Sequence, residues 1–165
     1  MDAERPVTEP FRLLFVCTGN TCRSPLAEVI ARQALTDRGW GHVEVRSAGV
    51  AAVDGGRASE GAERAALRHG LDLSSHRSAA LTPERLAWAD LILVISPGHL
   101  ARVADAGAAG KAALLAGFAA GGDPTGTAAV PDPFGGSDAQ YEATFTLLEE
   151  LVGRSLDRLA PLVAP

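Results

Sequence analysis

The feature that most constrains the fold is the alternation of short apolar runs with helical segments. The runs FRLLFVC (Phe11–Cys17) and LILVIS (Leu91–Ser96) are typical of strands that are buried on both faces. VEVRSAG, which starts at Val43, is a further strand candidate. Strands that alternate with helices predict a parallel sheet with right-handed crossovers, in which ligands bind beyond the carboxyl ends of the strands.

Capping signals predict where the first helices begin and end. Ser24 followed by Pro25 is typical of an N-cap and a first helical position, and an apolar stripe continues from there to Gly39. A second helical segment covers residues 58–69, and Gly70 follows it as a stop signal.

The second half of the chain is less regular. Thr82 and the proline after it open a short helix before the third strand, and Ser137 with Gln140 matches a capping box for a long amphipathic last helix. Residues 101–130 are so rich in alanine and glycine that periodicity says little about them. Within them AALLAGF, residues 112–118, is the candidate for a fourth strand.

Length and composition favour one domain over residues 1–165, with residues 1–10 as a flexible N-terminal extension. The chain has 165 residues, 47% of them hydrophobic, which is enough for one core covered by helices on both sides of a sheet. No apolar run is long enough to span a membrane, and the charged N-terminus is unlike a signal peptide, so we expect a cytoplasmic protein. A net charge of −5 argues against nucleic acid and anionic membranes as partners.

The stretch VCTGNTCRSP contains the candidate reactive and anion-binding residues. Cys17 stands at the end of the first strand, and Arg23 follows at the start of the first helix. The residues between them can curl so that successive backbone N–H groups point inward, which makes a concave site for a tetrahedral oxyanion. These residues are Thr18, Gly19, Asn20, Thr21 and Cys22.

Cys17 and Arg23 are the candidate nucleophile and phosphate clamp. A helix N-terminus and a nearby guanidinium both favour the thiolate form of cysteine. The planar fork of arginine can hold two phosphate oxygens and stabilise charge in the transition state. The alternative is that Cys17 is only a small buried hydrophobic residue. The chain has two cysteines, which is too few for a disulfide framework, and no C-x2-C zinc signature, so we expect no metal.

These residues resemble the phosphate-binding loop of the low-molecular-weight protein tyrosine phosphatase family, V-C-x-G-N-x-C-R-S-P. SAG at residues 47–49, SSHR at residues 74–77 and the DP of PDPF extend the resemblance over most of the chain. The resemblance implies a three-layer αβα fold with a central four-stranded parallel sheet in flavodoxin-like topology. It implies hydrolysis of phosphorylated proteins through a phosphocysteine, with inorganic phosphate as product and no cofactor.

The resemblance also implies that Asp132 is the general acid. It would protonate the leaving atom and then accept a proton from the hydrolytic water. Pro131 and Pro133 restrict the backbone on both sides of this carboxylate, which agrees with a held loop. The rival carboxylates, whose simpler interpretation is solvated loop or cap residues, are Asp90, Asp123 and Asp138.

Further roles rest on the resemblance. Asn20, Ser24, Ser47 and His76 are implied to form a hydrogen-bond network that supports the loop, with Ser24 also bonded to the thiolate. Cys22 is either a small residue that packs behind the loop or a redox partner that forms a reversible disulfide with Cys17.

Two details bear on which phosphorylated side chain is the substrate. Thr21 stands where tyrosine-specific members carry a larger aliphatic residue, and DPFGGS lacks their pair of aromatic residues. Both features resemble the protein-arginine phosphatases of the family. The Thr21 hydroxyl and the Asp132 carboxylate can accept hydrogen bonds from a guanidinium, which favours phosphoarginine over phosphotyrosine, whereas Phe134 can stack on either group.

The sequence also departs from the family, and other functions compete. After the third strand, residues 95–99 read ISPGH and lack the acidic residue of many tyrosine-specific members. An arsenate reductase needs further cysteines, and none follows Cys22. A redox-sensing or phosphate-binding domain needs neither Arg23 nor Asp132, so a phosphatase is the favoured interpretation.

Overall fold

Four parallel strands form the centre of the protein. The computed structural model describes residues 9–121 and 129–165, so the expected extension over residues 1–10 lies almost wholly outside the described residues. The strand order is β2-β1-β3-β4, which confirms the predicted parallel sheet. The strands are β1 (Phe11–Cys17), β2 (Val43–Gly49), β3 (Leu91–Val94) and β4 (Ala112–Leu114).

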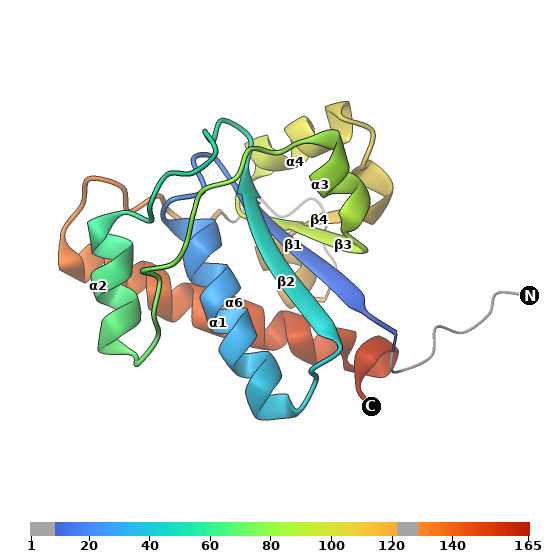
Figure 1. Cartoon of the computed structure of the whole chain (residues 1–165). Helices are drawn as coiled ribbons and strands as arrows, with labels where there is room; N and C mark the ends of the chain where they lie inside the picture. The colour runs from blue at the N-terminus through green and yellow to red at the C-terminus, as the bar shows by residue number, and fades with distance from the viewer. Residues whose placement is uncertain (1–8, 122–128) are drawn as a thin grey trace, which may run out of the picture.

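Helices cover both faces of the sheet, so the three-layer αβα fold is confirmed (Figure 1). α1 and α6 lie against one face, with α2 and α5 beside α6, and α3 and α4 lie against the other face. The helices are α1 (Arg23–Arg38), α2 (Glu60–Arg68), α3 (Pro83–Trp88), α4 (Pro97–Asp105), α5 (Leu115–Ala119) and α6 (Asp138–Val163), with a 3-10 turn η1 (Ala109–Lys111) before β4. No described helix combines the length and apolar content needed to cross a membrane.

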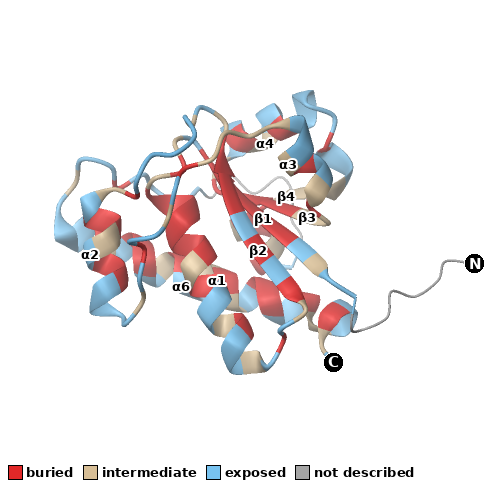
Figure 2. Cartoon of the chain, viewed as in Figure 1, coloured by how far each residue is buried: buried red, intermediate tan, exposed pale blue. Residues whose placement is uncertain are grey.

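The apolar run of β1 is buried because it faces a helical layer on each side. Leu13 and Phe15 belong to the cluster that α1 and α6 cover, while Leu14 and Val16 belong to the cluster under α3 and α4. Figure 2 shows buried residues along the centre of the sheet and on the inner faces of the helices. The core on both sides therefore fixes the position of Cys17, the last residue of β1.

Several boundaries follow the sequence signals. Gly39 ends α1 with a φ of 73°, a left-handed conformation that glycine adopts without strain. Thr82 caps α3, and Ser137 forms the predicted capping box with Gln140 at the start of α6. Along α6 the predicted apolar stripe is buried; it includes Tyr141, Phe145, Leu148 and Val152.

Other boundaries were predicted wrongly. α1 begins at Arg23, so Ser24 is not the N-cap and Pro25 is not the first helical residue. β3 ends at Val94, two residues before the end of the predicted run, and α4, which was not predicted, starts at Pro97. The fourth strand spans only 112–114, because the rest of AALLAGF turns into α5.

Gly61 tests the contact between α2 and α6. A Cβ atom at Gly61 would overlap the ring of Tyr141, whereas one at Gly153 in α6 would meet no atom within 4 Å. We expect Gly61→Ala to lower the free energy of unfolding by about 1–3 kcal/mol through overpacking. Gly153→Ala should raise the same quantity by ~0.5–1 kcal/mol, because alanine has the higher helix propensity. Urea denaturation measures both values, and equal stabilities of the two variants would contradict this account of the contact.

Candidate active site

The loop between β1 and α1 forms one wall of a cavity of about 300 Å³ at the carboxyl end of β1. The cavity brings together residues from the loop and from the segment before α6, which lie more than a hundred positions apart. Its lining consists of Cys17, Thr18, Gly19, Thr21, Cys22, Arg23, Asp132 and Phe134. The predicted candidates for nucleophile, clamp and acid therefore lie at one site.

Cys17 and Ser24 are in direct contact. The Cys17 sulfur is 2.7 Å from the Ser24 Oγ, and both residues are buried. This contact explains why Ser24 does not cap the helix: its hydroxyl is directed to the sulfur. Pro25 lies in the first turn of α1, where a backbone N–H has no partner within the helix and its loss costs little.

The Asn20 side chain fixes the directions of the hydrogen bonds around this contact. Its Oδ1 accepts from the backbone N–H of Ala79 at 2.9 Å, which identifies the other terminal atom as the nitrogen. That Nδ2 donates to Ser24 Oγ at 2.8 Å and to Ser47 Oγ at 2.9 Å. Because the Ser24 oxygen accepts from Asn20, its single hydrogen is free to donate to the Cys17 sulfur.

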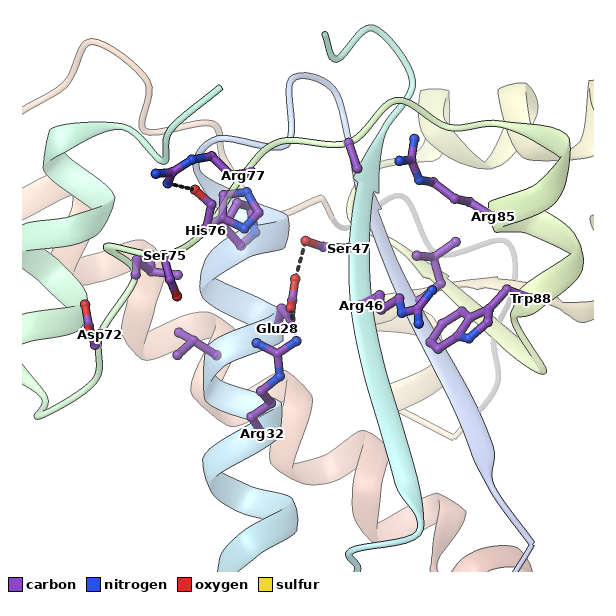
Figure 3. A pocket seen from close by; sticks show the side chains of 15 residues that line it. Glu28, Arg32, Arg46, Ser47, Asp72, Ser75, His76, Arg77, Arg85 and Trp88 are labelled. Carbon is purple, nitrogen blue, oxygen red and sulfur yellow. Dashed lines mark hydrogen bonds and ion pairs between the residues drawn. The ribbon is translucent and has the colours of Figure 1, made fainter. Parts of the chain in front are cut away.

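Ser47 continues the network to a residue that the sequence analysis missed. Its hydroxyl donates to Glu28 Oε1 at 2.5 Å, and Glu28 also forms an ion pair with Arg32 (Figure 3). Glu28 is buried, and its ion pair with Arg32 offsets part of the cost of that burial. An acidic and a basic residue four positions apart on a helix usually form a surface pair, so the sequence pattern concealed this inward contact.

His76, the last residue of the predicted network, and Gly49, which was not part of that network, hold the loop from outside. His76 contacts the Asn20 carbonyl oxygen through its Nε2 at 2.9 Å. At Gly49, the last residue of the SAG motif, a Cβ atom would collide with the carbonyl oxygen of Thr18 and the backbone nitrogen of Asn20. Asn20 itself has a φ of 56°, a left-handed conformation that asparagine tolerates better than most residues. Close approach of β2 thus maintains the curl of the loop.

Arg23 connects three segments of the chain. Its Nη1 donates to Ser96 Oγ at 3.1 Å and to the Val130 carbonyl at 3.0 Å, and its Nη2 lies 3.8 Å from Asp132 Oδ2. The guanidinium is buried, so these contacts offset part of the cost of removing its charge from water. Its remaining N–H groups are available to an anion in the cavity.

Asp132 is the carboxylate that the structure places at this cavity. Its Oδ1 accepts from the backbone N–H of Phe134 at 3.1 Å, and its side chain is 53% exposed. Among the rivals, Asp90 accepts from the backbone of Arg12 at the opposite end of the sheet, and Asp138 pairs with Arg64 at the start of α6. Asp123 lies outside the described residues.

His99 is a second residue that the sequence analysis missed. Its Nδ1 accepts from the backbone N–H of Ser96 at 3.2 Å, so the neutral ring carries its hydrogen on Nε2, which donates to Thr18 Oγ1 at 2.8 Å. Burial lowers the pKa of the His99 imidazole to about 4, and the charge of Arg23 acts in the same direction. The His99 side chain thus joins α4 to the loop between β1 and α1.

The remaining predicted residues lie around the cavity. Thr21 is partly buried with its hydroxyl 3.8 Å from the Cys22 sulfur, and Phe134 is 70% exposed at the rim. The Cys22 sulfur faces Ser59 Oγ at 3.2 Å and the hydroxyl of Tyr141 at 3.5 Å, and both cysteines are free thiols. Cys22 thus packs behind the loop and also lines the cavity with Cys17, a position that is compatible with both interpretations of this residue.

Comparison with known proteins places the chain in a family. Residues 12–162 match the model of the family described as low molecular weight phosphotyrosine protein phosphatase. The chain belongs to this family. It is 38% identical to a protein-arginine-phosphatase of Geobacillus stearothermophilus over 91% of this chain and 97% of the relative. It is 36% identical to low molecular weight protein-tyrosine phosphatase A of Mycobacterium tuberculosis, over 87% of this chain and 88% of the relative.

A solved structure adds a chemical observation about another member. The chain superimposes on an arginine phosphatase with a TM-score of 0.84 and 36% identity, over 90% of this chain and 95% of that one. That protein is a cysteine-to-serine mutant with a phosphorylated active-site serine. The match confirms the predicted family and fold.

The low pKa of His99 leads to a prediction about the stability of the protein in acid. Its pKa of about 4 in the folded protein lies below the value of about 6.5 expected in the unfolded chain. The unfolded state therefore binds the proton first, and the protein loses stability as the pH falls from about 6.5 towards 4. Over that interval we expect wild type to lose ~2 kcal/mol more of its free energy of unfolding than His99→Gln. Denaturant titrations at several pH values test this, and the same pH slope for both proteins would refute it.

Proposed function

We propose that this protein is a cysteine-dependent protein phosphatase that uses Cys17 as the nucleophile. The observation that carries the proposal is the Cys17 contact with Ser24, whose hydrogen is directed to the sulfur because Asn20 donates to the serine oxygen. A hydroxyl that donates to sulfur favours the thiolate over the thiol, and the thiolate is the form that attacks phosphorus.

In the proposed reaction the phosphoryl group binds among the backbone amides of residues 18–22, the Ser24 end of the loop and the Arg23 guanidinium. Cys17 attacks phosphorus and the bond to the leaving group breaks, while Asp132 donates a proton to the leaving atom. Asp132 then accepts a proton from water, which attacks the phosphocysteine and releases inorganic phosphate. The 3.8 Å separation between Arg23 and Asp132 supports a shared role over one substrate. Ser47 and His76 are proposed to support the loop.

We propose phosphoarginine in proteins as the favoured substrate. The Thr21 hydroxyl and the Asp132 carboxylate line the same cavity, and both can accept hydrogen bonds from the guanidinium of the substrate. The 38% identical relative is named as a protein-arginine phosphatase. Phosphotyrosine is the second candidate, because the exposed Phe134 ring offers a stacking surface and another relative is named as a tyrosine phosphatase.

The proposal extends to the location and partners of the enzyme. We propose that the whole chain acts as one cytoplasmic phosphatase domain whose partners are phosphorylated proteins, not nucleic acids or membranes.

We also propose that Cys22 protects Cys17 from irreversible oxidation. A peroxide would oxidise both thiols to a disulfide, and the two electrons and two protons that leave the sulfurs would reduce the peroxide to water.

Replacement of the nucleophile tests the mechanism. We expect Cys17→Ser to lower turnover by roughly a thousandfold or more, because a serine hydroxyl is a much weaker nucleophile than a thiolate. Phosphate binding should persist, since Arg23 and the loop are unchanged. If a phosphoryl group is trapped after incubation with a phosphopeptide, mass spectrometry should locate it on residue 17. Turnover near the wild-type rate would overturn the assignment of Cys17.

Substitution at Thr21 tests the substrate. Thr21→Ile removes the hydroxyl acceptor and adds apolar surface, so the ratio of kcat/KM for phosphoarginine over phosphotyrosine peptides should fall by about tenfold or more. Thr36→Ile, on the exposed face of α1, is the matched control and should leave the ratio unchanged. A wild-type preference for phosphotyrosine, or an unchanged ratio in Thr21→Ile, would show that the substrate assignment is wrong.

A further inference from the structure

A second cavity, of about 350 Å³, lies at the outer edge of β2, and it shares no lining residue with the active-site cavity. β2 is the edge strand of the sheet. Side chains from α1, from residues 72–79 and from α3 surround this edge (Figure 3). Its charged lining residues are Glu28, Arg32, Arg46, Asp72, Arg77 and Arg85.

The lining carries an excess of positive charge. Four arginines face two carboxylates, and Arg32 is already paired with Glu28. The other lining carboxylate, Asp72, accepts from the backbone N–H of Ser74 in its own turn. Within residues 9–121 and 129–165, no ion pair with a carboxylate is found for Arg46 or Arg77. Two guanidinium charges are thus left for an outside anion.

The arginines of this cavity are held in place by contacts that leave donors free. Arg46 lies over the Trp88 ring with its guanidinium carbon 4.4 Å from the centroid, an interaction that uses its face and not its N–H groups. Arg77 donates through Nη1 to the carbonyls of Ser74 and His76. Arg85 uses Nη1 for the Ala80 carbonyl and for Asp54. Because each group is already oriented, less side-chain entropy is lost when an anion binds.

The strand edge supplies a neutral donor as well. Alternate residues of β2 direct their backbone groups outward: the Val45 carbonyl accepts from Arg32, and the Gly49 N–H donates to the Ala79 carbonyl. Ser47 lies between these two residues and lines the cavity, so its backbone N–H faces the same side. Guanidinium and main-chain donors together are the usual partners of phosphate oxygens.

We propose that this cavity is a second anion site, which binds a phosphate group. A phosphate offers more acceptor oxygens than a carboxylate and so matches donors that come from several sides of the cavity. The group can be free phosphate or a second phosphorylated side chain on a protein substrate. The site is separate from the proposed catalytic centre, so it does not depend on which phosphorylated residue the enzyme hydrolyses.

Backbone amide NMR distinguishes the two sites in one titration. With inorganic phosphate and then tripolyphosphate as probes, the amides of residues 46–48 and 75–79 report on the second cavity, and those of residues 18–22 report on the active site. We expect both sets to saturate, each with its own dissociation constant. Ser47, His76 and Ala79 are bonded to Asn20 of the loop, so a shift alone is not sufficient. If residues 46–48 and 75–79 do not shift, or shift only with the dissociation constant of the loop, the proposal is overturned, while shifts in the loop still test the proposed function separately.

Charge reversal identifies the donors. Arg46→Glu and Arg77→Glu should each weaken binding at the second cavity by about tenfold, since an attraction becomes a repulsion. Neither change should alter the dissociation constant reported by residues 18–22. Arg154→Glu, on the exposed side of α6, is the matched control for net charge. Equal weakening by all three variants would show only a general charge effect and would refute the site.

Peptide kinetics separate the two sources of the phosphate group. If the ligand is carried by the substrate, a doubly phosphorylated peptide should show a KM several-fold below that of its singly phosphorylated form, and Arg46→Glu should remove the difference. Equal KM values, together with phosphate binding in the titration, assign the site to free phosphate.

Discussion

The Asn20 side chain is the constraint on which the geometry of the site depends. Its amide ties Ser24, Ser47 and the backbone of Ala79 to one point, and its backbone occupies a left-handed conformation that turns the loop. With both amide hydrogens used, the two serine hydroxyls have defined donor directions. A buried network in which every member has a partner is rigid, so the Cys17 sulfur has a fixed hydrogen-bond donor before any substrate arrives.

Arg23 connects segments of the chain on the other side of the cavity, as Asn20 does beside the loop. It joins the segment after β3, through Ser96, to the segment before α6, through the Val130 carbonyl. His99 reinforces this side, because it connects the backbone of Ser96 to the side chain of Thr18. The ends of β1 and β3 lie next to each other in the sheet, which brings these contacts within reach. The parallel topology therefore places the two halves of the site, and side-chain hydrogen bonds adjust them.

Local signals predicted those parts of the molecule in which one physical effect dominates. β1 was predicted to the residue, because an apolar strand buried on both faces has no competing pattern. The capping box of α6 and the glycine after α1 were also correct, since both signals act within a few residues. Ser24 was assigned wrongly because a tertiary partner, the Cys17 sulfur, took the hydroxyl that an N-cap would have used. The short fourth strand was overestimated because alanine and glycine favour no single structure strongly.

The same distinction between local signals and long-range contacts separates the site residues that were predicted from those that were missed. Cys17, Arg23 and Asp132 were predicted by motif and by family resemblance, and they line one cavity. Glu28 and His99 were missed because their contacts join segments that are distant in sequence, and neither residue type is informative at its position alone. Glu28 matched an ordinary helical ion pair, and His99 stood in a segment noted only for its lack of a carboxylate.

The depth of Cys17 limits what can reach it. Only 3% of this residue is exposed, whereas Phe134, which lines the same cavity, is 70% exposed. We therefore expect a phosphorus atom to reach the sulfur more easily at the end of a long side chain than at the end of a short one. Phosphoserine and phosphothreonine hold phosphorus closer to their own main chain than phosphoarginine and phosphotyrosine do. Under the proposed function, side-chain length would therefore favour the two longer substrates before any hydrogen bond distinguishes between them.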